Sequence, residues 1–346
     1  MDMKKNSLIY KILFPIACAA LLHACIDTVS FTGRKENNYL VVDGKVNLND
    51  SVQTISLTRT DEVGRSGNFP PERGAKVVLL ENSQSVASFL ETKPGSYQIY
   101  NFKPTEGYLY SIDIQLQGGD HYASQPELMP SPVPIDSVYF IFDGNAYFTL
   151  FSNIHIPENK KAPYLRWRTQ LVYQRSDLYC GALDQVTSCY YQLERKSDSQ
   201  KLILLDGSEL EPGANLAFPI TTVLVADTLF GEVTYYTIYQ ESITPSTFQY
   251  WEKVNRLLTQ TGSIFDTPPG QIRGNIYNVD DPNAPVLGLF YATAEDYARV
   301  KTIPTDFLPL HINPYCGAPG FPPNPFPFPD CCYCKFGIAK PDYWDQ

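Results

Sequence analysis

The sequence has 346 residues, of which 27 are basic and 37 acidic, so its net charge is −10 at neutral pH. An acidic surface argues against nucleic acid and anionic lipid headgroups as partners. Tyrosine (24), phenylalanine (19) and proline (28) are abundant, and short apolar runs between turn residues predict a mainly β protein and not a helical or doubly wound one.

The first 24 residues are predicted to be a lipoprotein signal peptide. Lys4 and Lys5 form a positive n-region, and the apolar stretch from Ile9 to Leu22 is shorter than the roughly 20 residues of a spanning helix. Leu22-His23-Ala24-Cys25 then resembles a lipobox, in which the thiol of Cys25 receives the lipid before the peptidase cuts ahead of it. The alternative is an ordinary secretory signal with a chance cysteine.

Cleavage before Cys25 would leave a more acidic chain of 322 residues. The removed segment carries three lysines and one aspartate, so the mature net charge is −12. Residues 25–37 are polar and are predicted to be a lipidated tether. Lipid on Cys25 would be the attachment to the membrane.

Residues 38–125 are predicted to form an Ig-like or prealbumin-like β-sandwich, because about seven short strands alternate with turns there. One example is Val52–Thr58, which places Gln53, Ile55 and Leu57 on one side. The glycine-led runs Gly74–Leu79, Gly95–Tyr97 and Gly107–Ile114 resemble prealbumin-like domains of the carboxypeptidase-regulatory kind. That resemblance implies a structural or adhesive module without catalysis of its own.

Residues 126–134 hold four prolines and are predicted to be a connector. Residues 135–346 would then be a larger C-terminal β-domain with one helix at about 244–260. Thr244 is the expected cap and Pro245 suits the first helical turn. Apolar residues follow at helical spacing from Phe248 to Leu258. A proline- and cysteine-rich tail ends the chain.

Six cysteines remain beyond Cys18 and Cys25, an even number that predicts up to three disulfides in an exported chain. They are Cys180, Cys189, Cys316, Cys331, Cys332 and Cys334. Cys180 and Cys189 lie between two strand-like runs, and we expect them to bond and close a hairpin. The C-terminal four would then pair among themselves. A thiolate metal site from these four is the alternative, although no paired C-x-x-C spacing is present.

Recognisable catalytic motifs are not evident in the sequence. His121, His155 and His311 lack paired ligand spacing, and no nucleophile elbow, P-loop or dinucleotide fingerprint occurs. Asp280-Asp281-Pro282-Asn283 is predicted to be a turn and not a calcium loop. We therefore expect neither a cofactor nor a metal. A catalytic pair of carboxylates in a cleft is kept as an alternative, because such a pair leaves no local sequence motif.

Clustered aromatic residues are the remaining sign of a binding site. Trp167, Tyr179, Tyr190 and Tyr191 are the candidates, since exposed rings stack on sugars or anchor protein interfaces. The alternative is ordinary core packing and cross-strand pairing. Trp167 alternates with Leu165 and Thr169 and is expected to share their side of a strand.

A set of motifs resembles domain-of-unknown-function family 4249. These motifs are Leu40-Val41-Val42-Asp43-Gly44, Pro134-Ile135-Asp136-Ser137-Val138, Thr261-Gly262-Ser263-Ile264-Phe265-Asp266, Gly274-Asn275-Ile276, Val286-Leu287-Gly288-x-Phe290 and the ending Lys340-Pro341-Asp342-Tyr343-Trp344. The doublet Cys331-Cys332 departs from the expected tail. The resemblance implies an outer-membrane lipoprotein of Bacteroidota-type cells, encoded beside a TonB-dependent receptor.

The function predicted from the sequence is non-enzymatic binding at the cell envelope. The protein would bind a TonB-dependent receptor or its substrate as an accessory of uptake, on either side of the outer membrane. The polar loop from Asp61 to Arg73 is the candidate contact, because long loops on a rigid sandwich carry recognition. The alternatives are a hydrolase acting on surface polymers and a purely structural or adhesive module.

Overall fold

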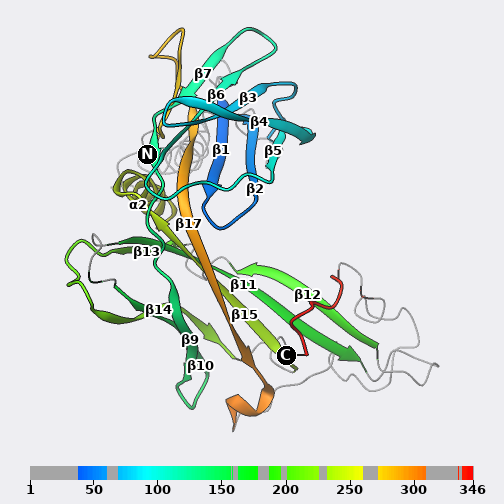
Figure 1. Ribbon diagram of the computed structural model, residues 1–346. Coiled ribbons are helices and arrows are strands. Elements are labelled where there is room, and N and C mark those ends of the chain that lie inside the picture. The colour runs from blue at the N-terminus through cyan, green and yellow to red at the C-terminus, as the bar shows by residue number, and fades with distance from the viewer. Residues whose placement is uncertain are drawn as a thin grey trace, which may run out of the picture. The chain divides into compact units, whose positions relative to one another are not determined.

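The structure is a computed structural model that describes most of the chain beyond residue 37 (Figure 1). The described residues are 38–60, 69–156, 158, 163–177, 187–195, 201–225, 232–259, 272–308, 334 and 337–345, and all of them belong to one compact unit. The predicted signal peptide, Cys25, the tether and residues 61–68 lie outside them. The described chain is mainly β, as predicted. None of its helices combines the length and apolarity needed to cross a membrane.

Eight strands in the first part of the chain form the N-terminal β-sandwich. They are β1 (Leu40–Asn47), β2 (Val52–Arg59), β3 (Lys76–Glu81), β4 (Gln84–Lys93), β5 (Ser96–Tyr100), β6 (Leu109–Gln115), β7 (His121–Ser124) and β8 (Glu127–Leu128). One layer runs β1-β2-β5-β4 and the other β4-β3-β6-β7, so β4 takes part in both. Alternating residues fill the core between them, and Gln53, Ile55 and Leu57, predicted to share one side of the strand, are all buried.

Most of the later strands form two further layers around a second core. They are β9 (Ile135–Phe142), β10 (Tyr147–His155), β11 (Tyr164–Asp177), β12 (Thr187–Arg195), β13 (Ile203–Asp206), β14 (Asn215–Leu224), β15 (Thr234–Ile243), β16 (Ile276–Asn278) and β17 (Leu287–Thr302). Strands β14-β10-β9 make a separate three-stranded sheet. It packs against β11, β15 and β17, with Phe148, Trp167 and Tyr236 among the core residues.

Strand β17 belongs to both parts of the molecule (Figure 1, orange). Its residues Leu287–Thr293 pair in parallel with β1, and Ala294–Thr302 pair antiparallel with β15. The short strand β16 pairs with β7 of the sandwich. From the sequence, both segments are predicted to belong to a contiguous C-terminal domain from residue 135. Strand partners far apart in the chain are not visible in strand patterns, and two late segments in fact complete the sandwich.

The predicted helix is confirmed as α2 (Pro245–Thr259). Thr244 is its cap, since its hydroxyl oxygen accepts the backbone N–H of Thr247 at 3.2 Å. The buried carboxylate of Glu127 accepts hydroxyl bonds from Thr244 and Ser246 at the same end. Burial raises the pKa of Glu127, although these hydroxyl donors oppose the rise. A 3-10 helix, η2 (Pro304–Phe307), follows β17.

Candidate functional site

Trp167, one of the predicted binding residues, lies in the second core. It is 3% exposed, its ring stacks on Phe218 at 4.6 Å, and its Nε1–H donates to Gln240 Oε1 at 2.9 Å. Leu165 and Thr169 are buried on the same side of β11, as the alternation predicts. A buried ring with a satisfied N–H cannot stack on a ligand from solvent, so the core alternative is the correct one for this residue.

The tyrosines of β12 contact other aromatic residues of the protein. Tyr191 stacks on its cross-strand partner Tyr173 with centroids 5.4 Å apart. Tyr190 meets the edge of Trp344 at 4.9 Å. Both are half-buried, which fits cross-strand and tail packing better than a free binding platform. Tyr179 lies outside the described residues.

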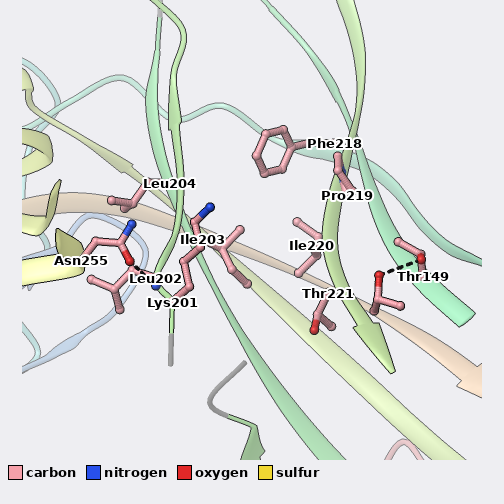
Figure 2. A pocket seen from close by; sticks show the side chains of 11 residues that line it. Thr149, Lys201, Leu202, Ile203, Leu204, Phe218, Pro219, Ile220, Thr221 and Asn255 are labelled. Atoms are coloured by element: carbon pink, nitrogen blue, oxygen red, sulfur yellow. Dashed lines mark hydrogen bonds between the residues drawn. The ribbon is translucent and has the colours of Figure 1, made fainter. Parts of the chain in front are cut away.

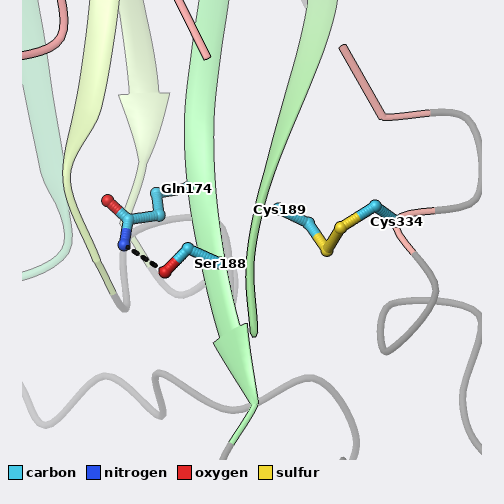
Figure 3. The surroundings of a disulfide bond; sticks show 4 residues. All are labelled: Gln174, Ser188, Cys189 and Cys334. Atoms are coloured by element: carbon cyan, nitrogen blue, oxygen red, sulfur yellow. Dashed lines mark hydrogen bonds between the residues drawn. A yellow bond between two sulfur atoms is a disulfide. The ribbon is translucent and has the colours of Figure 1, made fainter. Parts of the chain in front are cut away.

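The described disulfide joins Cys189 to Cys334, 145 positions apart in sequence (Figure 3). Their Cα atoms are 5.2 Å apart, and the neighbouring N–H of Ile338 donates to the carbonyl of Tyr190 at 2.8 Å. The predicted Cys180–Cys189 bond is therefore wrong. A short sequence gap favours a local pair, but the C-terminal segment returns to β12 and supplies the partner. This bond also removes Cys334 from any thiolate metal site.

The other predicted site residues do not come together as a metal site in the described part of the chain. Cys180, Cys316, Cys331, Cys332 and His311 lie outside the described residues. His121 pairs with Asp113 at 2.6 Å, and His155 bonds to Asn215 at 2.9 Å. Within the described part of the chain, no group of three or more His, Cys, Asp or Glu side chains is placed to hold a metal ion.

The side of the β11, β15 and β17 sheet that faces away from the second core carries mainly charged, polar and aromatic side chains. Alternate residues of these strands point away from the second core, and cross-strand pairing aligns them in rows. We call this set the polar face: Arg166, Arg168 and Gln170 of β11, Thr237, Tyr239 and Glu241 of β15, and Glu295, Tyr297, Arg299 and Lys301 of β17. Tyr297 is 54% exposed, and Arg299 and Lys301 are exposed beside it.

Glu241 is the buried centre of one end of the polar face. It is 2% exposed, and its carboxylate contacts Lys45 of β1 at 2.7 Å and Arg166 at 3.2 Å. Burial alone would raise its pKa, but the charges of Lys45 and Arg166 outweigh that effect and hold the pKa below its ordinary value. Glu295 joins the same network, at 3.0 Å from Lys45 and 3.2 Å from Arg168. Glu241 is therefore ionised, and both carboxylates are paired with cations.

Cations and aromatic rings alternate along the polar face. The Arg168 guanidinium lies 3.6 Å from the centroid of the Tyr239 ring, and Tyr239 contacts Tyr297 at 5.9 Å. Arg299 lies 4.7 Å from the Tyr297 centroid and 4.0 Å from that of Tyr343. Such contacts fix the planes of otherwise flexible side chains at a partly exposed surface.

Two segments cover the ends of the polar face. At one end Trp344 of the C-terminal segment packs on Tyr235, with the ring centroids 4.9 Å apart, and the two form a small core with Val172. At the other end α2 places Trp251 under Arg166, with the guanidinium 3.9 Å from the ring centroid. The middle of the face, from Arg168 to Arg299, lies between these covers.

A separate cavity of about 510 Å³ lies between β13 and β14 (Figure 2). Ile203 and Ile220 face each other from the two strands, and Phe218 lines the upper part of the view. Asn255 of α2 closes one side by accepting the N–H of Leu202 at 2.9 Å. The lining is mainly apolar, and none of the site residues predicted from the sequence contributes to it.

The sequence matches the family model described as "Domain of unknown function (DUF4249)" over residues 26–299. The chain belongs to the DUF4249 family. The predicted resemblance is confirmed, and it brings no established activity with it. No curated protein matches the chain.

Two motifs that carry the DUF4249 resemblance meet where β16 approaches β17. Asn275 donates to the carbonyl of Phe290 at 2.7 Å and accepts its N–H at 3.0 Å. Gly288 has a φ of +93°, and a Cβ there would lie 1.9 Å from the carbonyl oxygen of Val42. Only glycine fits that backbone and that spacing. These motifs of the family therefore have a structural role in joining β17 to the sandwich.

Three solved structures show a distant likeness to this DUF4249 chain. The Bacteroides ovatus mixed-linkage glucan utilization locus SGBP-B, in complex with a heptasaccharide, is 11% identical with a TM-score of 0.23, covering 55% of this chain and 52% of that one. The Yersinia pseudotuberculosis adhesin InvE is 15% identical, with a TM-score of 0.17 and coverages of 61% and 58%. A two-domain fibronectin type III segment of chicken tenascin is 14% identical, with a TM-score of 0.15 and coverages of 60% and 91%.

The chain thus spans about half the length of the first of these structures and less than two thirds of the second. Likeness at these TM-scores carries no argument about what the protein binds.

Proposed function

We propose that the protein is a non-enzymatic binding protein of the cell envelope, anchored through lipid on Cys25. In this proposal it serves a TonB-dependent outer-membrane receptor by binding that receptor or its substrate, and the polar face is the binding surface. The lipobox-like Leu22–Cys25 and the family resemblance support the location. The polar face supports the binding role.

The observation that carries the proposal is the charge and ring content of the polar face. Its described side chains include four basic groups and two acidic ones, in a chain whose overall net charge is −10. The four basic groups are Arg166, Arg168, Arg299 and Lys301. Arginine and tyrosine are the residues enriched at the centres of binding surfaces, because each offers a large rigid area and directed hydrogen bonds.

The two carboxylates of the face favour binding over hydrolysis. A glycosidase uses one carboxyl as a proton donor, so one member of its pair keeps a raised pKa. The pKa of Glu241 is instead lowered by Lys45 and Arg166, and Glu295 is paired with two cations. Glu241 therefore does not keep the proton that a general acid donates, and both carboxylates instead order the surface through their ion pairs.

The candidate contact loop from Asp61 to Arg73 is partly fixed to the sandwich. Its last residues are bound to β2: Glu72 pairs with Arg59, and Pro70 accepts the backbone N–H of Arg59 at 2.8 Å. A deletion that tests the loop should therefore be confined to residues 61–68.

Co-purification from native membranes tests the proposal. Cells producing the tagged wild type, an Arg168→Glu/Tyr297→Ala variant or an Arg256→Gln control would be cross-linked, and receptor peptides quantified by mass spectrometry. Arg256 is the matched control because it is an exposed arginine paired with Glu252 on α2 at 3.0 Å. We expect the polar-face variant alone to lose the receptor or its substrate. Equal recovery in all three would refute the polar face as the surface, and turnover of an envelope polymer by the wild type would refute the binding role.

Lipid attachment has its own test. Labelled fatty acid should appear on the wild type and be absent from Cys25→Ala, which should also leave the membrane fraction. Label retained on that variant would contradict the anchor.

A further inference from the structure

Arg299 contacts two tyrosine rings on the polar face. Its guanidinium carbon lies 4.0 Å from the Tyr343 centroid and 4.7 Å from that of Tyr297. Its Nε–H donates to the hydroxyl of Thr237 at 3.2 Å. Three contacts therefore fix the plane of an exposed arginine, whose two terminal nitrogens carry four further N–H donors.

A guanidinium fixed in this way is suited to a carboxylate. The fork of two parallel N–H groups matches the two oxygens of a carboxylate, and pre-ordering reduces the entropy lost on binding. Lys301 follows two residues later on the same side of β17, about 7 Å along the strand, with its Nζ 5.6 Å from the Tyr235 centroid. The exposed ring of Tyr297 lies on the other side of Arg299.

We infer that Arg299, Lys301 and Tyr297 form a subsite for an acidic polysaccharide whose sugars carry carboxylates. This inference rests on the proposed function, because it names the ligand class of the same face. Arg299 is the anchor for a sugar carboxylate, Lys301 contacts a second acidic group, and Tyr297 offers a ring to the face of a sugar.

The other side chains of the face fit a sugar chain better than an acidic peptide. Gln170 Oε1 accepts the Tyr239 hydroxyl at 3.4 Å, so amide and hydroxyl groups line the middle of the face. Val172, the aliphatic residue beside them, is 1% exposed and covered by the C-terminal segment. A peptide would find no exposed aliphatic anchor among the described side chains of the polar face, whereas a polymer of hydroxyls and carboxylates needs none.

The C-terminal segment completes the subsite. Tyr343 lies in the segment that the Cys189–Cys334 bond and Trp344 hold against the sheet. One wall of the Arg299 clamp therefore depends on that bond. Reduction should weaken binding of the acidic chain without removing Arg299 itself.

Calorimetric titration of the purified protein with polygalacturonate oligomers tests the inference. We expect saturable binding that weakens with added salt, and about tenfold or greater loss of affinity in Arg299→Gln. Arg299→Lys should lie between the two, because it keeps the charge but not the fork. Arg256→Gln should bind as the wild type does. Circular dichroism and thermal melting of each variant confirm that loss of affinity is not loss of folding.

The inference would be overturned if the wild type did not bind polygalacturonate, or if Arg299→Gln and Arg256→Gln lost affinity equally. Arg299-dependent binding of poly-glutamate in place of the polyuronate would also overturn it. Titration with a neutral glucan shows whether the carboxylates are required, and equal affinity for it would also contradict the subsite. If the protein does not bind polygalacturonate, receptor binding through the polar face is not contradicted. Polyuronate binding without any receptor or uptake partner would instead contradict the accessory role.

Discussion

The two sides of the sheet formed by β11, β15 and β17 are made by the same strands and have opposite chemistry. On one side Leu171, Tyr236 and Ile238 are fully buried against the three-stranded sheet. On the other side Arg168, Tyr239 and their neighbours form the polar face. The contrast arises from the two-residue period of a strand, which sends successive side chains to opposite sides.

The contrast shows where stability and recognition are separated in this protein. The core side is stabilised by apolar area and close packing, which tolerate little change in volume. The polar face is ordered by ion pairs and ring contacts, each of which contributes little to stability when exposed. Residues of that face can therefore be used for binding without a large effect on folding.

The largest effect is expected on the core side. Trp167→Ala removes the stack on Phe218 and leaves the amide of Gln240 without its indole donor. We expect a loss of about 3–5 kcal/mol in the free energy of unfolding, measured by urea denaturation. Tyr297→Ala, on the exposed side, is the control and should change stability by about 0.5 kcal/mol or less. Similar losses in both variants would contradict the division between the two sides.

Glu241→Gln tests the buried end of the polar face, where the contrast between sides is weakest. The change removes the carboxylate that pairs with both Lys45 and Arg166 and leaves Lys45 with Glu295 alone. We expect a loss of about 3 kcal/mol at pH 7, because removing one partner of a buried ion pair leaves uncompensated charge.

The same variant should change the acid dependence of stability. The pKa of Glu241 is lowered from its ordinary value of 4.5, so its stabilising effect is present above pH 4.5 and is lost as the pH falls through the lower, folded-state pKa. The difference between wild type and Glu241→Gln should therefore shrink on acidification below pH 4.5. A constant difference over that range would contradict an ionised, paired Glu241.

A smaller effect is expected at the start of α2, which covers one end of the polar face. Thr244→Ala removes the cap on Thr247 and one hydroxyl donor to Glu127. We expect a loss of about 1 kcal/mol, seen as a shift in the urea midpoint with an unchanged slope. Thr259→Ala, at the other end of the helix, is the control for loss of a threonine hydroxyl.

The smallest effect is expected in the middle of the polar face. Arg168→Ala removes an ion pair with Glu295 and a contact with the Tyr239 ring. Because 39% of the Arg168 side chain is exposed, we expect a loss of only about 0.5–1 kcal/mol. A loss comparable to that of Trp167→Ala would show that this face is a second core.

Local features of the fold could be predicted from the sequence. Thr244 and Pro245 mark the start of α2 because capping chemistry and the proline ring act within one turn. Alternation in β2 identifies Ile55 and Leu57 as buried because the period of a strand is fixed. The same rule places Trp167 on one side of β11 with Leu165 and Thr169, whereas the burial of that side follows only from the packing of the second core.

Features that depend on distant partners could not be predicted. The pairing of β17 with β1, and of Cys189 with Cys334, joins segments whose proximity no local pattern records. The polar face had a partial signal, since Arg166 and Arg168 alternate with buried residues of β11. That these arginines belong to one surface with Tyr239 and Tyr297 depends on the cross-strand register, which no single strand records.

The shared strand β17 limits how this protein can be divided or recombined. A gene fragment ending at residue 125 would encode the first strands of the sandwich without β16 and without the segment that pairs with β1. It would expose an unpaired edge of β1, which invites edge-to-edge aggregation. Fusion proteins and segment exchanges between relatives should therefore keep residues 38–302 together as one folding unit.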